Sequence, residues 1–222
     1  MVGEPPGDGQ VVRAYTAAAP ESGGRTIDIA VLASGSGTNL QALLDNPVVR
    51  PHVSVVVSDR PGAGALQRAA GAGIATAVVA WKELADRELF STALADVVEG
   101  AGAKGVVLAG FMRILAPGFV DRFPDRILNV HPSLLPAFPG GKAVAAALAH
   151  GAKVTGVTVH VVDRGVDSGP IVAQVPVAVL PGDTEESLHA RIKVEEHLVY
   201  PRIVEALVEG RLVIDGRNVE IR

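Results

Sequence analysis

The chain has 222 residues, no cysteine and a formal net charge of −4 at pH 7. This charge argues against a protein that coats nucleic acid, because such proteins depend on Lys and Arg against phosphates. The lack of cysteine excludes disulfides and thiolate metal sites, and no apolar run reaches the ~18 residues of a membrane-spanning helix. We therefore expect a cytoplasmic protein whose partners include neither nucleic acid nor membrane.

Residues 1–25 hold several Gly, Pro and Ala residues and show no hydrophobic periodicity. This composition is typical of a disordered leader. After residue 25 the sequence shows no internal repeat and no linker, so we expect residues 26–222 to form a single domain.

The first expected strand, residues 25–33, runs into a glycine-rich turn, Ser-Gly-Ser-Gly-Thr-Asn at 34–39, and then into a helix that includes residues 40–44. A strand, a glycine-rich turn and a helix in this order direct free backbone N–H groups and a helix dipole at an anion. A tight turn with only a structural purpose explains the same residues. The turn alone therefore leaves anion binding as one of two explanations.

Three kinds of anion site compete at this turn. A Walker A loop would need Gly-Lys followed by Ser or Thr, but Thr38 and Asn39 follow Gly37. A dinucleotide-binding loop would need glycine in place of Leu40, although Asp59 lies at about the distance expected for a ribose-binding acid. The third kind is a cradle for one phosphate monoester, made by residues 37–39.

The middle of the chain alternates between expected strands, at 52–58, 74–79 and 104–109, and expected helices, at 63–72 and 82–99. This alternation indicates an α/β fold with a Rossmann-like, doubly wound and mostly parallel sheet. Ligands of such sheets bind beyond the carboxyl ends of strands, where the strand order reverses. We expect the turn at 34–39 and the loop at 110–113 to open together at that point, beside the first and fourth strands.

In the last third we expect a mobile loop at 137–141, a helix at 142–150 and two long strands at 153–162 and 171–180 joined by a tight turn. Asp183 with Glu186 three residues later predicts a helix N-terminus, and this helix is expected to end near residue 207. A small hairpin is expected at 211–222, around Asp215 and Gly216.

A second polar feature follows the apolar run at 126–128, where the sequence is Asn-Val-His-Pro-Ser-Leu-Leu-Pro at 129–136. Alternate strand residues face the same way, so Asn129 and His131 share one side of a strand tip, and the prolines then end the ladder. The structural alternatives are that Asn129 caps a turn and that His131 is a hydrogen-bonded core residue. Asp167, in a Gly/Pro turn, is equally explained as a solvated turn residue.

The remaining polar residues are less informative. Glu196 and the arginines Arg87 and Arg113 are each explained by a solvated surface position. Four histidines show no metal-ligand spacing, and we assign them no chemistry: His52, His150, His160 and His189.

Four segments, in order, resemble phosphoribosylglycinamide formyltransferases, a family of folate-dependent enzymes of purine synthesis. They are residues 34–41 (Ser-Gly-Ser-Gly-Thr-Asn-Leu-Gln), 108–115 (Leu-Ala-Gly-Phe-Met-Arg-Ile-Leu), 129–136 and 166–170 (Val-Asp-Ser-Gly-Pro). The resemblance covers about residues 26–210. The third segment and the downstream Asp are shared by formyltetrahydrofolate enzymes generally, and the first segment narrows the resemblance to the glycinamide ribonucleotide enzymes.

The resemblance implies the formyltransferase fold and a reaction between two small-molecule substrates. A formyl group moves from N10-formyltetrahydrofolate, the co-substrate, to the amine of 5-phosphoribosylglycinamide by direct transfer through a tetrahedral intermediate, giving formylglycinamide ribonucleotide and tetrahydrofolate without a metal. The implied catalytic residues are Asn129, His131 and Asp167. The implied ribonucleotide-binding residues are Gly35, Ser36, Gly37, Thr38, Asn39 and Glu196. The implied folate-binding residues are Arg87, Met112, Arg113, Ile114, Leu115, Asn129, Asp163 and Asp167.

One segment departs from this family. Relatives often carry His and Arg after the position of Pro139, whereas this chain has Gly-Gly-Lys-Ala-Val at 140–144. Two folate enzymes are alternatives, a formyltetrahydrofolate hydrolase and a methionyl-tRNA formyltransferase, but each usually carries an additional domain for which we expect no room here. An NAD-linked oxidoreductase or a non-catalytic nucleotide-binding module is the alternative from another class. A homodimer is left open.

Overall fold

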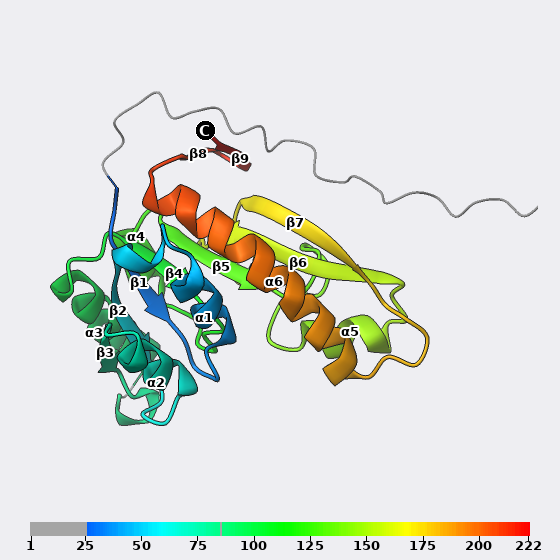
Figure 1. Ribbon diagram of the computed structural model, residues 1–222, viewed down its shortest axis with the longest axis horizontal. Coiled ribbons are helices and arrows are strands. Elements are labelled where there is room, and N and C mark those ends of the chain that lie inside the picture. Colours follow the sequence, from blue (N-terminus) through cyan, green and yellow to red (C-terminus); the bar gives the residue numbers. More distant parts are fainter. Residues whose placement is uncertain (1–25, 85) are drawn as a thin grey trace, which may run out of the picture.

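The computed structural model describes residues 26–84 and 86–222, so the leader expected at residues 1–25 lies outside the described part. A seven-stranded sheet runs through the middle of the molecule in the order β3-β2-β1-β4-β5-β6-β7 (Figure 1). Its strands are β1 (Ile29–Leu32), β2 (Val53–Ser58), β3 (Ala75–Val78), β4 (Gly105–Leu108), β5 (Ile127–His131), β6 (Val154–Val161) and β7 (Ile171–Ala178).

The sheet is parallel from β3 to β5 and antiparallel from β5 to β7. The chain builds outward from β1 through β2 to β3 and then returns to the other side of β1 as β4. The strand order therefore reverses between β1 and β4, as the sequence predicted. The expected doubly wound, mostly parallel α/β fold is confirmed.

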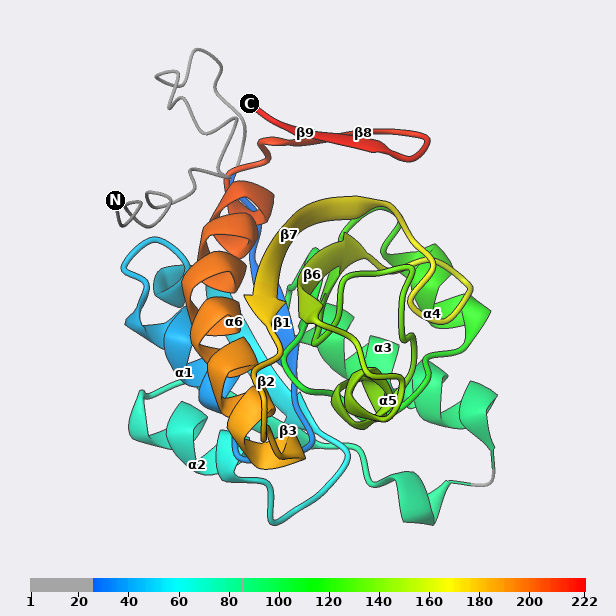
Figure 2. The ribbon, with the colours of Figure 1, turned by 90° about the vertical axis from the view of Figure 1, so that its right-hand side faces the viewer.

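Helices cover both faces of this sheet (Figure 2). They are α1 (Thr38–Asp45), α2 (Gly64–Gly71), α3 (Arg87–Gly100), α4 (Pro117–Arg122), α5 (Ala143–Ala149) and α6 (Glu185–Val208), with short 3₁₀ turns η1 (Arg50–His52) and η2 (Trp81–Glu83). Helices α1 and α6 pack together on one face, and α3 and α4 pack together on the other.

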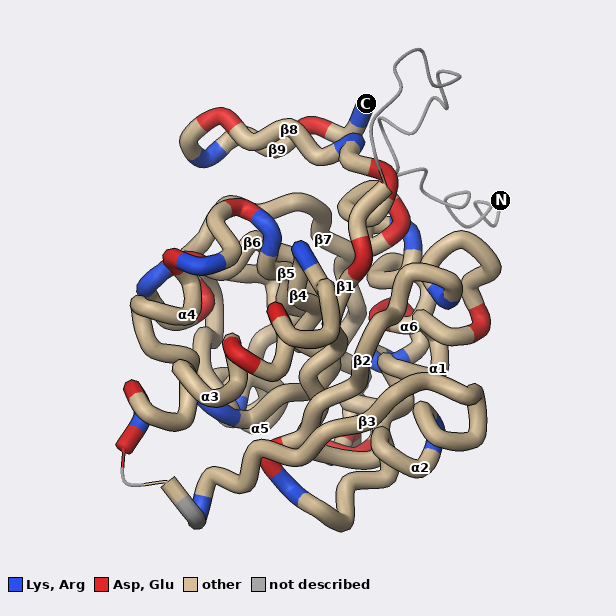
Figure 3. Tube along the Cα trace, turned by 90° about the vertical axis from the view of Figure 1, so that its left-hand side faces the viewer, with Lys and Arg blue, Asp and Glu red and all other residues tan. Residues whose placement is uncertain are grey.

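Two apolar clusters lie on the opposite faces of the sheet, because successive strand residues point to opposite sides. In β1, Ile29 and Val31 face the cluster under α1 and α6, whereas Ala30 and Leu32 face the cluster under α3. Every residue of β1 and β4 is buried, which explains their unbroken apolar sequence. Figure 3 shows the charged residues along the chain, mainly at element ends and in loops.

Three local predictions are wrong. The segment expected as one helix at 82–99 is η2 followed by α3, because the Asp86 carboxylate accepts a hydrogen bond from the backbone N–H of Leu89 (2.8 Å) and starts the helix there. The last long helix begins one residue later than expected, since Thr184 and Ser187 form the capping box. Helix α4, which begins at Pro117, was not predicted at all.

The chain ends in the expected hairpin, formed by β8 (Leu212–Asp215) and β9 (Asn218–Ile221). It follows α6 and lies beside β7 (Figure 2). The Arg217 side chain in its turn donates hydrogen bonds to the carbonyl oxygens of Ser168 and Gly169. The hairpin thus contacts the 163–170 turn that carries Asp167.

Candidate active site

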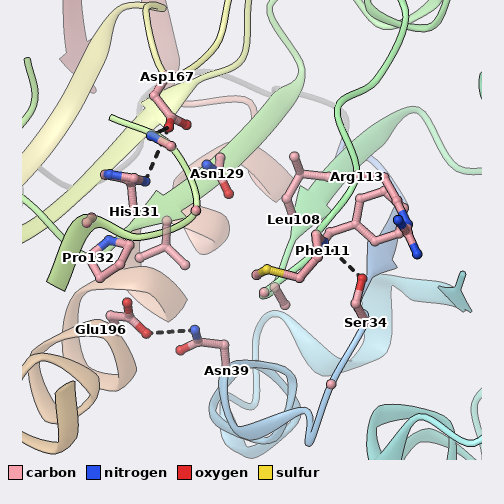
Figure 4. Close-up of a pocket in the computed structure, with 18 of the residues that line it drawn as sticks. Ser34, Asn39, Leu108, Phe111, Arg113, Asn129, His131, Pro132, Asp167 and Glu196 are labelled. Carbon is pink, nitrogen blue, oxygen red and sulfur yellow. Dashed lines mark hydrogen bonds and ion pairs between the residues drawn. The ribbon is translucent and has the colours of Figure 1, made fainter. Parts of the chain in front are cut away.

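A cavity of about 530 Å³ opens at the carboxyl ends of β1 and β4, where the strand order reverses. This volume lies within the range of small-molecule sites in proteins. Most of its lining comes from six segments: the turn at 34–39, the loop at 108–115, the end of β5, the segment at 140–144, the turn at 163–167 and the inner face of α6. Elements far apart in the sequence therefore enclose one site, shown in Figure 4.

The glycine-rich turn forms one wall of the cavity with all of residues 34–39. Gly37 has φ +75°, and a Cβ at this position would lie 2.6 Å from the Cα of Ala65 in α2. Glycine is required here for both the backbone conformation and the close approach of α2. The turn brings the N-terminus of α1, with its unpaired backbone N–H groups, to the cavity.

Glu196 on α6 faces this turn, and its carboxylate accepts a hydrogen bond from the Asn39 side-chain amide (2.8 Å; Figure 4). Glu196 is buried rather than solvated. Burial raises the pKa of this carboxyl group, while the Asn39 hydrogen bond and the charge of Lys193 act in the opposite direction. The Asn39 amide and the Glu196 carboxylate, a hydrogen-bond acceptor, therefore lie at the same end of the cavity as the anion-binding turn.

Asn129, His131 and Asp167 converge on the other side of the cavity (Figure 4). The distance from Nδ1 of His131 to a carboxylate oxygen of Asp167 is 3.5 Å. His131 is 5% exposed, and the Asp167 side chain is 13% exposed, so both groups are largely withdrawn from solvent. The predicted juxtaposition of an amide, an imidazole and a distant carboxylate is present in the structure.

His160 completes this cluster. Its Nδ1 lies 3.0 Å from the Val161 carbonyl oxygen, which can only accept, so Nδ1 carries a proton. Its Nε2 lies 3.1 Å from the amide nitrogen of Asn129 and 3.6 Å from the Asp167 carboxylate. His160 therefore contacts two of the three predicted catalytic groups.

The Asp167 carboxylate is held in its ionised form. Interaction with the His160 ring, the hydrogen bond from the backbone N–H of Gly140 (2.7 Å) and the charge of His131 lower the pKa of Asp167 to about 2, against the opposing effect of burial. Asp167 also adopts φ +51°, a conformation uncommon outside glycine. Strain of this kind is retained where the surrounding contacts fix a functional residue.

The loop at 137–141 closes over this cluster through two backbone contacts. The Nε2 of His131 donates to the carbonyl oxygen of Phe138 (2.9 Å), and the N–H of Gly140 donates to Asp167. On the loop, both contacts use backbone atoms, so they do not depend on which side chains the loop carries. In this conformation both ring nitrogens of His131 have partners.

The loop at 110–116 forms the apolar end of the cavity. Met112 and Ile114 are more than half exposed, yet both line it together with Leu115. The backbone N–H of Met112 donates to the Ser34 hydroxyl (2.9 Å), which connects this loop to the glycine-rich turn. Exposed apolar side chains beside a cavity are suited to a flat organic ligand.

Most of the predicted binding residues line this cavity. Asp163 does so, although its carboxylate also accepts hydrogen bonds from Gly165 and Ser168 within its own turn. Arg87 does not: it lies exposed at the first position of α3, outside the residues that line the cavity. Its placement in the folate site therefore finds no support in this conformation.

Several residues that line the cavity were not predicted from the sequence, among them His160, His189 and Lys193. His160 was assigned no chemistry, although the strand register places it opposite Asn129. His189 and Lys193 lie on α6 one turn apart, on the same face as Glu196. Helical spacing within a predicted helix could have identified this second pair, whereas the partner of Asn129 requires the register of β5 and β6.

The described residues contain no group of three or more His, Asp or Glu side chains that could hold a metal ion. Burial lowers the pKa of His189, and the charge of Lys193 adds to this effect. None of the described helices is long and apolar enough to span a membrane. The side chains that line the cavity offer amide, imidazole, carboxylate, hydroxyl, ammonium and guanidinium groups.

Comparison with known proteins shows which family the chain belongs to. The family described as formyl transferase matches residues 27–204, a span that includes every segment of the cavity. The chain belongs to this formyl transferase family. The resemblance to phosphoribosylglycinamide formyltransferases predicted from the sequence is confirmed.

Individual formyl transferases show how far the similarity extends. The chain is 47% identical over 201 residues to the phosphoribosylglycinamide formyltransferase of Mycobacterium tuberculosis H37Rv, with 87% of this chain and 93% of that protein covered. It is 44% identical over 191 residues to the trifunctional purine biosynthetic protein adenosine-3 of Drosophila melanogaster, with 84% of this chain covered, but it spans only 14% of that relative's length.

A solved structure, that of glycinamide ribonucleotide transformylase 1 from Symbiobacterium toebii, superimposes with a TM-score of 0.85 at 50% identity. The match covers 89% of this chain and 95% of that one. The formyl transferase fold of this chain therefore extends over the whole cavity.

Proposed function

We propose that this formyl transferase moves a formyl group from N10-formyltetrahydrofolate to the amine of 5-phosphoribosylglycinamide, a step of purine synthesis. The observation that carries the proposal is one cavity with an anion-binding turn at one end, an apolar lip at the other and Asn129, His131 and Asp167 between them. The resemblance of the four sequence segments and the names of the relatives support the same reaction.

The ribonucleotide occupies the polar end. Its phosphate accepts hydrogen bonds from backbone N–H groups of residues 37–39 at the start of α1, and Lys193 adds a positive charge from the facing helix. Glu196 accepts hydrogen bonds from the glycinamide end of the nucleotide. This polarity directs the amine toward the centre of the cavity.

The folate occupies the apolar end, against Met112, Ile114 and Leu115. The turn at 163–167 closes over its ring system. Holding the donor and the acceptor in line supplies a large share of the rate enhancement, since effective molarities of ~10⁵–10⁸ M are reached by well-oriented groups.

Attack of the amine on the formyl carbon places negative charge on the formyl oxygen. The Asn129 amide donates a hydrogen bond to this oxygen, and its contact with His160 fixes its orientation. One such donor typically contributes ~10²–10³ in rate.

His131 supplies the proton that the departing folate nitrogen takes up. Its Nδ1 faces Asp167, which orients the ring. Its Nε2–H, which donates to the Phe138 carbonyl in this structure, becomes the transferable proton when that bond is exchanged for one to substrate. Asp167 then receives, through water, the proton that the amine loses, and acid–base steps of this kind contribute ~10²–10⁴ each.

Single substitutions to alanine at Asn129, His131 and Asp167 test these roles. Each is expected to lower turnover by at least ~10² while both substrates still bind. Turnover is measured as the absorbance change of the folate on formyl loss, and binding by calorimetry. His52→Ala is the matched control, because His52 pairs with Asp28 outside the cavity. Activity like that of the unchanged protein in any of the three variants would overturn the assignment.

The turnover assay and a thermal-stability measurement separate the alternative functions. Rapid formate release without glycinamide ribonucleotide would indicate a hydrolase, and thermal stabilisation by NAD but not by a folate analogue would indicate the oxidoreductase. Two expectations stay predictions: the cytoplasmic location and the single domain at 26–222. Whether the protein forms a homodimer stays open.

A further inference from the structure

Asp59, considered from the sequence as a ribose-binding acid, has no part in the proposed reaction. It follows β2 directly, and its side chain is completely buried. Its Oδ2 accepts a hydrogen bond from Nε of Arg113 (2.7 Å), and Arg60 lies at 3.7 Å. A buried carboxylate is costly unless it is paired, so the Arg113 contact is the main reason that Asp59 can occupy this position.

Arg113 is held on two sides. Besides Asp59, the ring of Trp81 lies 5.1 Å from its guanidinium carbon, in a cation–π arrangement. Trp81 in turn contacts Phe90 edge-on, and Phe90 stacks with Phe111 of the same loop. Figure 4 shows the Arg113 side chain extending away from Asn129, His131 and Asp167.

These contacts supply the middle anchor of the loop that lines the apolar end of the cavity. Ser34 holds the loop at Gly110 and Met112, and the Ser91 hydroxyl accepts from the backbone N–H of Ala116. Between these two ends, Met112 and Ile114 expose their side chains to the cavity. The Asp59–Arg113 pair fixes the backbone between the two exposed side chains.

We propose that Asp59 is a positioning residue for the folate half of the cavity. Its carboxylate holds Arg113 and thereby fixes residues 112–115 in the conformation that receives a folate. Arg113 acts as an anchor through Asp59 and Trp81, and its positive charge is already compensated within the protein. That the ligand is a folate rests on the proposed function, whereas the anchoring of the loop by Asp59 and Arg113 does not.

Asp59→Asn tests the proposal, because the amide keeps the shape of the side chain and removes its charge. The Kd for a non-reactive formyltetrahydrofolate analogue is expected to rise about tenfold, the effect of weakening one charged hydrogen bond. The KM for glycinamide ribonucleotide is expected to stay within about twofold. Asp96→Asn is the matched control, since Asp96 pairs with Arg122 on the surface.

Trp81 offers a direct readout, because it is the only tryptophan of the chain. Its emission in the ligand-free protein is expected to shift in Asp59→Asn and not in Asp96→Asn. Equal emission and equal analogue affinity in Asp59→Asn and the unchanged protein would refute the anchoring. If no folate analogue binds the unchanged protein, the proposed function fails, and the emission shift alone still decides the role of Asp59.

A double-mutant cycle of Asp59→Asn and Arg113→Lys distinguishes anchoring of the loop from direct contact of Arg113 with the ligand. Arg113→Lys keeps the positive charge but loses the Nε hydrogen bond to Asp59. Because the Arg113 side chain is partly exposed, this variant can replace Asp59→Asn as the test if Asp59→Asn does not fold. If both residues act through one contact, the double variant binds the analogue no more weakly than the weaker single variant. Losses that multiply would show that Arg113 binds the folate independently and would overturn the proposal.

Discussion

At the scale of single residues, the cavity holds two carboxylates that the protein treats in opposite ways. Asp167 accepts hydrogen bonds and faces two imidazoles, which keeps its pKa at about 2. Glu196 is buried on α6 beside one neutral amide, and burial raises its pKa. The first group is ionised in the ligand-free protein, so it can orient His131 and is free to receive a proton, and the second is suited to hydrogen bonding with a ligand that replaces its lost hydration.

Glu196→Gln is expected to stabilise the ligand-free protein at pH 7.5 and to weaken ribonucleotide binding. A carboxyl group whose pKa is raised in the folded protein favours folding below its unfolded pKa and loses that contribution as the pH rises through the folded pKa. The glutamine variant does not titrate, so its thermal midpoint should exceed that of the unchanged protein at pH 7.5, with the gap shrinking toward pH 4. The KM for the ribonucleotide should rise by roughly tenfold or more.

At the scale of elements, the turn between β1 and α1 is fixed by its packing on α2. Gly37 approaches Ala65 closely, and the backbone N–H of Ala65 donates to the Gly35 carbonyl (3.1 Å). Gly64 also lies close to Ser36, since a Cβ there would be 3.1 Å from the Ser36 carbonyl oxygen. The anion-binding turn therefore depends on small residues in a neighbouring helix.

Gly37→Ala is expected to destabilise the protein by about 1–3 kcal/mol, because alanine is strained at φ +75° and its Cβ meets the backbone of α2. Urea unfolding measures this loss. Gly35→Ala is the matched variant for stability in the same turn, since nothing lies within 4 Å of a Cβ at Gly35. Equal unfolding free energies for the two variants would contradict the packing argument.

At the scale of the whole molecule, α6 connects the two halves of the cavity to the sheet. The Tyr200 hydroxyl lies 3.0 Å from the carbonyl oxygens of both Leu108, the last residue of β4, and Leu128, the second residue of β5. Burial raises the pKa of Tyr200 well above its usual value, so the hydroxyl remains a donor over the working pH range. One turn earlier on the same helix, Glu196 faces the ribonucleotide end.

Tyr200→Phe is expected to cost about 1–3 kcal/mol of stability, because it leaves two buried carbonyl groups without this donor. The aromatic ring remains, so packing is preserved and the loss reports the hydroxyl alone. Thermal and urea unfolding measure it. Unchanged stability would show that the two carbonyl groups are satisfied without Tyr200.

The local sequence pattern was sufficient to predict much of the fold. Alternation of apolar strands with helices predicted the doubly wound sheet, and the turn at 34–39 was correctly placed where the strand order reverses. The start of α6 was missed by one residue, because Asp183, Thr184 and Ser187 are all competent capping residues and only their hydrogen bonds show which one caps. Helix α4 is a short segment of mixed polarity, with too few residues to show a period.

The sequence by itself determined which residues can do chemistry and which face of each element carries them, because side-chain type and strand or helix periodicity are local properties. Only the tertiary structure decided which of them meet. Asn39 and Glu196 are 157 positions apart, and His160 reaches Asn129 through the register of two antiparallel strands. Contacts of this kind depend on how the elements pack, and packing is a property of the whole chain that no local pattern contains.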